Sequence, residues 1–146
     1  MALRACRGLA LSEKVVILLS ALALILSVAN VGRAIMAVRY SVRLPDLPTT
    51  ISLDYLAAMG GFWGVAFLAC SVGLSLFREW ARRATLAAVA LYEINGWMNR
   101  LLFSASDYAD QTIPRDIVLT VIFLLLFGIP LNLPQIRQTF KRAREE

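Results

Sequence analysis

Four long apolar runs constrain this chain more than any other feature of its sequence. Three of them, residues 15–32, 55–77 and 117–133, contain 18, 23 and 17 residues without a charge. The remaining run, 84–103, is the third in chain order and is interrupted by the charged residues Glu93 and Arg100. A helix crosses the hydrocarbon core of a bilayer with about 20 apolar residues, and no segment alternates as a barrel strand does. The sequence therefore predicts an all-α membrane protein, a four-transmembrane-helix bundle.

Composition agrees with this prediction and excludes several kinds of site. The chain is 59% hydrophobic and 17% charged, whereas soluble domains have about 45–50% apolar and about 25% charged residues. It has no histidine, which excludes His-ligated haem, His-based zinc sites and Ser-His or Cys-His catalysis. Cys6 and Cys70 form no C-x-x-C spacing. We expect no cofactor, no metal site and no catalytic residues.

The connections between the runs are too short to form a second domain. No predicted loop exceeds about 15 residues, too few to bury a core of its own. We expect a single membrane domain over residues 1–146, with a short basic tail at 134–146. The predicted spans are about 14–38, 53–77, 82–104 and 115–133.

The first span has one alternative interpretation, a cleaved signal peptide. Arg4, Arg7 and Lys14 would form its positive region, and Ala29 would end a small-residue cleavage site. The apolar run continues well past Ala29, further than the apolar region of a signal peptide extends. We therefore expect the first span to be retained.

Basic residues orient the predicted bundle. With the N-terminus inside, ten of the fifteen basic residues lie on the cytoplasmic side and five on the other, so the positive-inside rule places both termini in the cytoplasm. Topology then accounts for the net charge of +5, with no nucleic-acid partner. We expect a multi-pass protein of the bacterial cytoplasmic (inner) membrane, with the lipid bilayer as its surroundings. The cytoplasmic set is Arg4, Arg7, Lys14, Arg78, Arg82, Arg83, Arg137, Lys141, Arg142 and Arg144.

Glu93 is the most informative residue, because it lies near the middle of the third predicted span. A carboxylate at that depth is expected to face the bundle interior, find a partner or take up a proton. Asn95 and Asn99 lie on another side of the same helix, which makes it polar on two flanks. Glu93 is therefore either a protonatable site for transport or ligand binding, or a structural clamp bonded to asparagine or arginine.

Arg100 lies two turns from Glu93, toward the outer membrane face. Its simplest role is to extend toward the lipid headgroups. The alternatives are a charge pair with Glu93 and binding of an anionic lipid.

The second span contains a small-residue pattern. Gly60 and Gly64 form a G-x-x-x-G motif, with Gly61 and Trp63 between them, and this spacing lets another helix backbone approach closely. The motif predicts either packing within the chain, with the third span as a candidate neighbour, or homodimerisation. Trp63 and Trp97 are expected to pack beside the glycines or to line a pocket.

These features favour a protein that is not an enzyme. The leading hypothesis is a small structural or accessory membrane protein that acts by helix association, with itself as a homo-oligomer or with other membrane subunits. The alternative is a small oligomeric transporter or channel that uses Glu93 as an intramembrane protonatable site. A third hypothesis is a lipid or quinone pocket near Trp63, Trp97 and Tyr92.

Overall fold

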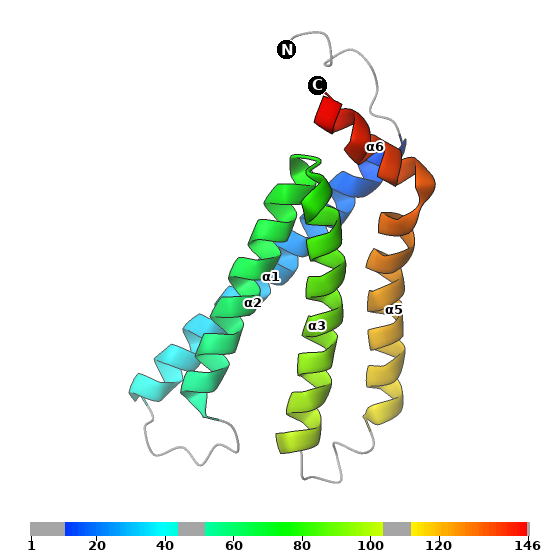
Figure 1. Ribbon diagram of the computed structural model, residues 1–146. Helices are drawn as coiled ribbons and strands as arrows, with labels where there is room; N and C mark the ends of the chain where they lie inside the picture. The colour runs from blue at the N-terminus through cyan, green and yellow to red at the C-terminus, as the bar shows by residue number, and fades with distance from the viewer. Residues whose placement is uncertain (1–10, 44–51, 104–111, 146) are drawn as a thin grey trace.

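All the secondary structure in the described part of the chain is helical. The structure, a computed structural model, describes residues 11–43, 52–103 and 112–145. No strand occurs in these ranges, so the predicted all-α class is confirmed. The helices are α1 (Leu11–Arg43), α2 (Leu53–Ser75), α3 (Glu79–Phe103), α5 (Ile113–Asn132) and α6 (Pro134–Glu145) (Figure 1).

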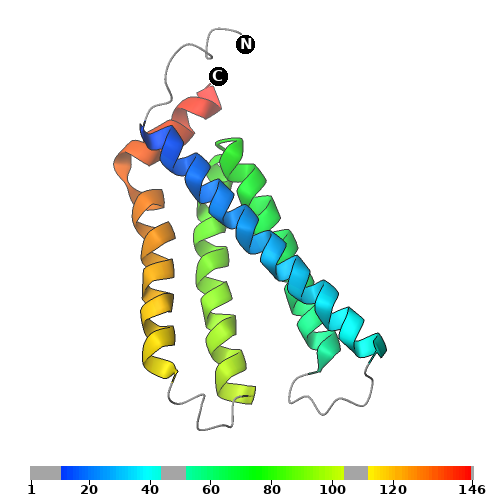
Figure 2. The same cartoon turned by 180° about the vertical axis from the view of Figure 1, so that it is seen from behind.

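The helices form two pairs closed at one end by α6. α1 crosses α2 obliquely, while α3 and α5 run side by side (Figures 1 and 2). α6 lies across the end of the bundle where α1 begins and α5 finishes (Figure 1). Toward the opposite end the α1–α2 pair diverges from the α3–α5 pair, as both views show.

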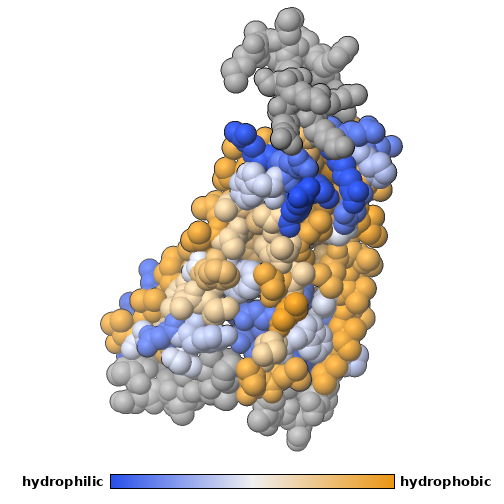
Figure 3. All heavy atoms as spheres, viewed as in Figure 1, coloured by the Kyte–Doolittle hydropathy of each residue, from blue (hydrophilic) through white to orange (hydrophobic). Residues whose placement is uncertain are grey.

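Three helices, α1, α2 and α5, are long and apolar enough to cross a membrane. α3 is also long, at 25 residues, but its polar side chains lower its hydropathy and it does not meet the same criterion. The apolar segment of α5 is only 6% buried, against 33% in α1 and 39% in α2. Apolar side chains consequently cover much of the surface over α5 (Figure 3).

Small residues bring α1 and α2 into close contact. Ser27 Oγ donates a hydrogen bond to the Gly64 carbonyl at 2.7 Å. A Cβ atom placed on Gly60 would lie 2.8 Å from the backbone oxygen of Asn30, closer than real Cβ contacts. Gly60 and Gly64 therefore pack within the chain, and their neighbour is α1 rather than α3.

A serine cluster extends the same interface toward the α6 end. Ser20 Oγ donates to the Ser71 carbonyl at 3.0 Å, and Ser71 Oγ donates to the Ser20 carbonyl at 2.9 Å. Ser75 Oγ lies 2.6 Å from Ser20 Oγ. Side-chain hydroxyls thus join two helix backbones directly, an arrangement suited to surroundings that offer no water.

The tail that was expected to be only basic is an amphipathic helix. α6 begins at Pro134, a residue favoured in the first turn because its missing N–H needs no partner there. Ile136 and Phe140, one turn apart, are 2% and 1% exposed. Phe140 packs against Phe77 at the α2–α3 turn, with ring centroids 6.2 Å apart. α6 therefore closes the core at this end.

Candidate functional site

α3 carries two polar flanks that face different neighbours. Glu93, Trp97 and Arg100 recur at helical spacing and bond to residues of α5 and of the segment just before it. Asn99, on the other flank, bonds to α2. The predicted division of the polar residues between two sides of the helix is therefore seen in the structure, and α3 joins the two helix pairs.

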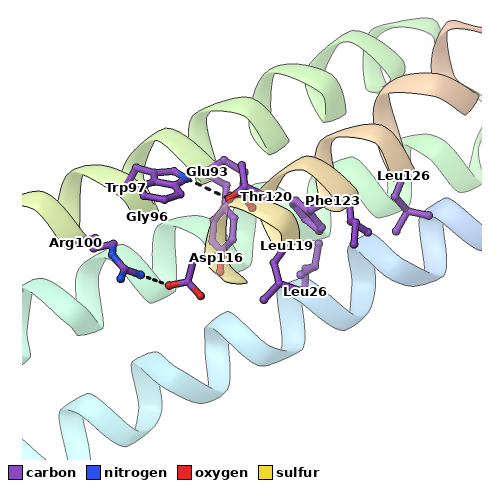
Figure 4. A pocket seen from close by; sticks show the side chains of 12 residues that line it. Leu26, Glu93, Gly96, Trp97, Arg100, Asp116, Leu119, Thr120, Phe123 and Leu126 are labelled. Carbon is purple, nitrogen blue, oxygen red and sulfur yellow. Dashed lines mark hydrogen bonds and ion pairs between the residues drawn. The ribbon is translucent and has the colours of Figure 1, made fainter. Parts of the chain in front are cut away.

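Glu93 is part of a hydrogen-bonded chain with Thr120 and Trp97 (Figure 4). The Thr120 hydroxyl donates to Glu93 Oε2 at 2.6 Å, and Trp97 Nε1 donates to Thr120 Oγ1 at 3.1 Å. These two bonds clamp the middle of α3 to α5. Sequence reasoning proposed an asparagine or an arginine as the partner of Glu93 and missed Thr120, which lies inside an uncharged run.

Arg100 pairs with Asp116 at the start of α5 (Figure 4). Its guanidinium also donates to Thr112 Oγ1 at 2.8 Å and lies 5.8 Å from the centre of the Trp97 ring, a distance at which a cation is attracted to the ring face. In the structure Arg100 therefore bonds to Asp116 and Thr112. This arrangement favours neither a charge pair with Glu93 nor an arginine side chain that extends toward the lipid headgroups. Arg115 Nε lies 3.0 Å from the other Asp116 oxygen.

The second flank of α3 contacts α2 through Asn99. Its Oδ1 atom accepts a hydrogen bond of 2.8 Å from the Tyr55 hydroxyl. Asn95, one turn earlier, is half-buried and lines a cavity between the two helices. The candidate set Glu93, Asn95, Asn99 and Arg100 therefore spreads over two contacts of α3 and does not converge on one point.

Aromatic side chains fill the space beside Glu93. Trp63 and Phe67 of α2 each meet the ring of Tyr92 edge-on, with centroids 5.3 Å apart. Trp63 is 6% exposed, and its buried Nε1–H has no hydrogen-bond partner in the described part of the chain. A buried indole N–H normally finds an acceptor. The unpaired N–H group of Trp63 is an exception to this rule and sets Trp63 apart from the aromatic residues around it.

Two cavities meet at this part of α3. The larger, about 670 Å³, is largely open to the surface and lies between α1, α3 and α5. The smaller, about 210 Å³, is more enclosed and lies between α1, α2 and α3. Tyr92, Glu93 and Gly96 line both of them. Glu93 therefore links α3 to α5 through a hydrogen bond and also lines both cavities.

The remaining candidates differ in what surrounds them. Gly60 and Trp63 line the smaller cavity, and Trp97 lines the larger one. Gly64 packs under Val31 of α1, whereas a Cβ atom on Gly61 would meet nothing within 4 Å. Of the sequence candidates, Gly61 alone has no close neighbour at its Cβ position.

Comparisons with models of protein families, with curated proteins and with solved structures each find no match. Among residues 11–43, 52–103 and 112–145, no three acidic or cysteine side chains gather in a way that could hold a metal ion.

Proposed function

We propose that this chain is an integral membrane protein with four spans, α1, α2, α3 and α5. Three of these helices are apolar enough to cross a bilayer by composition alone. The inclusion of α3 is supported by its polar contacts, because Glu93, Asn99 and Arg100 all have partners on neighbouring helices. Polar groups that are paired inside a bundle are compatible with a span.

The proposal places both termini on the cytoplasmic side, in a bacterial cytoplasmic membrane. Charge supports this orientation, because hydrophilic side chains gather at the α6 end of the bundle (Figure 3). The basic residues of the α2–α3 turn and the start of α3 belong to this end, with Lys14 at the start of α1 and Arg137 in α6. Excess Lys and Arg mark the cytoplasmic side of membrane proteins.

Reporter fusions test this orientation. Alkaline phosphatase needs an oxidising compartment for its disulfides, so we expect activity when it is fused after Arg43 and none when it is fused after Arg78. Green fluorescent protein fused after Glu146 should fluoresce. The reverse pattern at Arg43 and Arg78 would contradict the proposed topology, and phosphatase activity at both sites would contradict α2 as a span.

We further propose an accessory role without enzymatic activity, through association with a second copy or with other membrane subunits. The observation that supports it is the hydrogen-bonded chain of Glu93, Thr120 and Trp97. In this chain Glu93, the carboxylate near the middle of the third predicted span, helps to hold α3 against α5. Polar residues that serve as interhelical clamps stabilise a membrane scaffold and need no bound substrate.

One observation favours the second candidate function, transport with Glu93 as a protonatable site. Glu93 lines both cavities. Thr120 donates its hydrogen bond to the Oε2 atom of Glu93 and not to Oε1. A carboxylate at the junction of two spaces is placed where a proton or a small ligand would pass between them.

Substitutions at two positions, Thr120 and Glu93, distinguish the clamp from the transport site. Thr120→Val removes both hydrogen bonds and should lower the free energy of unfolding in detergent by about 1–2 kcal/mol, whereas Thr120→Ser keeps the hydroxyl and should cost less. In reconstituted vesicles, the unmodified protein and the Glu93→Gln variant should both give a proton flux no higher than that of empty vesicles. A wild-type flux that Glu93→Gln abolishes without loss of folded protein would establish transport and overturn the accessory role.

A further inference from the structure

The two cavities beside Glu93 differ in chemical character. The larger is walled mainly by aliphatic and aromatic side chains, among them Leu26 of α1 and Leu119, Ile122 and Leu126 of α5. The smaller is lined by polar side chains that include Asn30, Asn95 and Asn99. Because Glu93 and Gly96 line both, the apolar space on one flank of α3 and the polar space on the other adjoin at this turn of the helix.

The polar cavity contains hydrogen-bonding capacity that the protein itself does not use. Trp63 lines it, and the Trp63 Nε1–H is buried without a partner in the described residues. Thr120 bonds to Glu93 Oε2, which leaves Oε1 to accept a bond. An indole N–H requires an acceptor and a carboxylate oxygen requires a donor. A hydroxyl group supplies both.

Charge around the cavities argues for a neutral ligand. Taken together, the two cavities are lined by two basic side chains, Arg33 and Arg100, and two acidic ones, Glu93 and Asp116, and Arg100 is paired with Asp116. Neither sign dominates in the combined space, so a head group with a net charge would gain no general attraction there. The apolar walls of the larger cavity suit a hydrocarbon chain, and its volume is within the range of ligand pockets, about 300–1,000 Å³.

We infer that these adjoining cavities bind a neutral single-chain amphiphile whose head group carries hydroxyls. The head group lies in the smaller cavity, with a hydroxyl between Trp63 Nε1 and Glu93 Oε1. The hydrocarbon chain lies in the larger cavity, against α5. This inference depends on the membrane location in the proposed function and is independent of the accessory role.

Gly96 offers a way to block the site without disturbing the fold. It lines both cavities, and a Cβ atom on it would meet nothing within 4 Å. A leucine at this position therefore extends into the space that the ligand would occupy. Gly32 of α1 also has nothing within 4 Å of its Cβ position and lines neither cavity, so Gly32→Leu is the matched control.

The experiment measures quenching of tryptophan fluorescence by a monoacylglycerol with a brominated chain, in phosphatidylcholine nanodiscs. A Trp80→Phe background removes the one tryptophan outside the cavities, which is 54% exposed. We expect saturable quenching in this background and with Gly32→Leu, and binding weaker by about tenfold or more with Gly96→Leu. Quenching that rises linearly with probe in all three proteins reports bulk lipid and would overturn the inference.

A second substitution tests the head-group contact. Trp63→Phe keeps the aromatic packing and removes the unpaired N–H, so it should weaken binding of the monoacylglycerol several-fold, while a brominated fatty acid methyl ester, which has no hydroxyl, binds weakly to both proteins. Equal binding of the two probes would overturn the assigned head group. A chain that enters nanodiscs but shows no saturable quenching disproves the site alone, whereas failure to enter bilayers disproves the membrane proposal itself.

Discussion

Replacing Gly60 with leucine is expected to separate α1 from α2 and to leave little folded protein, while the same change at Gly61 preserves the fold. A Cβ atom on Gly60 would lie 2.8 Å from Asn30 O and 3.0 Å from Ala34 N. Both are backbone atoms, so no side-chain rotation relieves the overlap and the two helices must move apart. Gly61 has nothing within 4 Å of its Cβ position, which makes it a control one residue away on the same helix.

The size of the effect follows from overpacking and from the contacts that separation would break. Extra methylenes in a packed interface cost about 1–3 kcal/mol when neighbours can adjust. At Gly60 the moving helix would also lose the hydrogen bond from Ser27 to the Gly64 carbonyl. We therefore expect Gly60→Leu to lower the free energy of unfolding by about 3 kcal/mol or more.

Denaturation in mixed detergent micelles, followed by circular dichroism, measures the difference between the two variants. Gly61→Leu should match the unmodified protein or exceed it slightly, because leucine has the higher helix propensity. Equal destabilisation by the two substitutions would mean that α1 does not pack on the Gly60 face of α2, contrary to the structure.

The sequence allowed the positions of the long helices to be predicted, because each coincides with an apolar run or with a local signal. The span expected at 53–77 corresponds to α2 (Leu53–Ser75), and the span expected at 115–133 corresponds to α5 (Ile113–Asn132). Pro114 and Asp116 lie in the first turn of α5, a position that Pro and acidic residues favour, so the sequence also contains a local signal for the start of this helix.

The partners of the polar residues could not be predicted in the same way. Helical periodicity places Glu93 and Arg100 on one face of α3, but it does not say which helix that face meets. Thr120 lies inside an uncharged run, and Asp116 lies in the first turn of α5, where acidic residues are common for local reasons, so neither residue indicates a partner on α3. Antiparallel pairing of α3 with α5 brings the end of one beside the start of the other, which is why Arg100 meets Asp116.

α6 shows a signal that was present in the sequence and was not used. From its basic residues, the segment 134–146 was expected to form only a short basic tail. Ile136 and Phe140 are spaced one helical turn apart and are both buried. A proline in the first turn followed by apolar residues at this spacing predicts a short amphipathic helix.

The ion pair between Arg100 and Asp116 is expected to be the most costly polar contact to break. Their side chains are 16% and 28% exposed, so removal of one leaves a largely shielded charge without its partner. In a membrane such a charge costs about 2.5–3.5 kcal/mol at the centre and less toward the interface. Because both residues lie near helix ends, we expect a loss of about 2 kcal/mol for Asp116→Leu and somewhat less for Arg100→Leu, since Arg115 still contacts Asp116.

A double-mutant cycle isolates this pair from the loss of the individual side chains. Arg100→Leu combined with Asp116→Leu removes both charges, so the double variant should be more stable than the sum of the single losses implies, by about 1–2 kcal/mol. Arg115→Leu is the control, because Arg115 also contacts Asp116 but is 64% exposed, and its loss should cost about 0.5 kcal/mol or less. Strict additivity, or an Arg115→Leu loss equal to that of Arg100→Leu, would show that Arg100 does not hold α3 against α5 through Asp116.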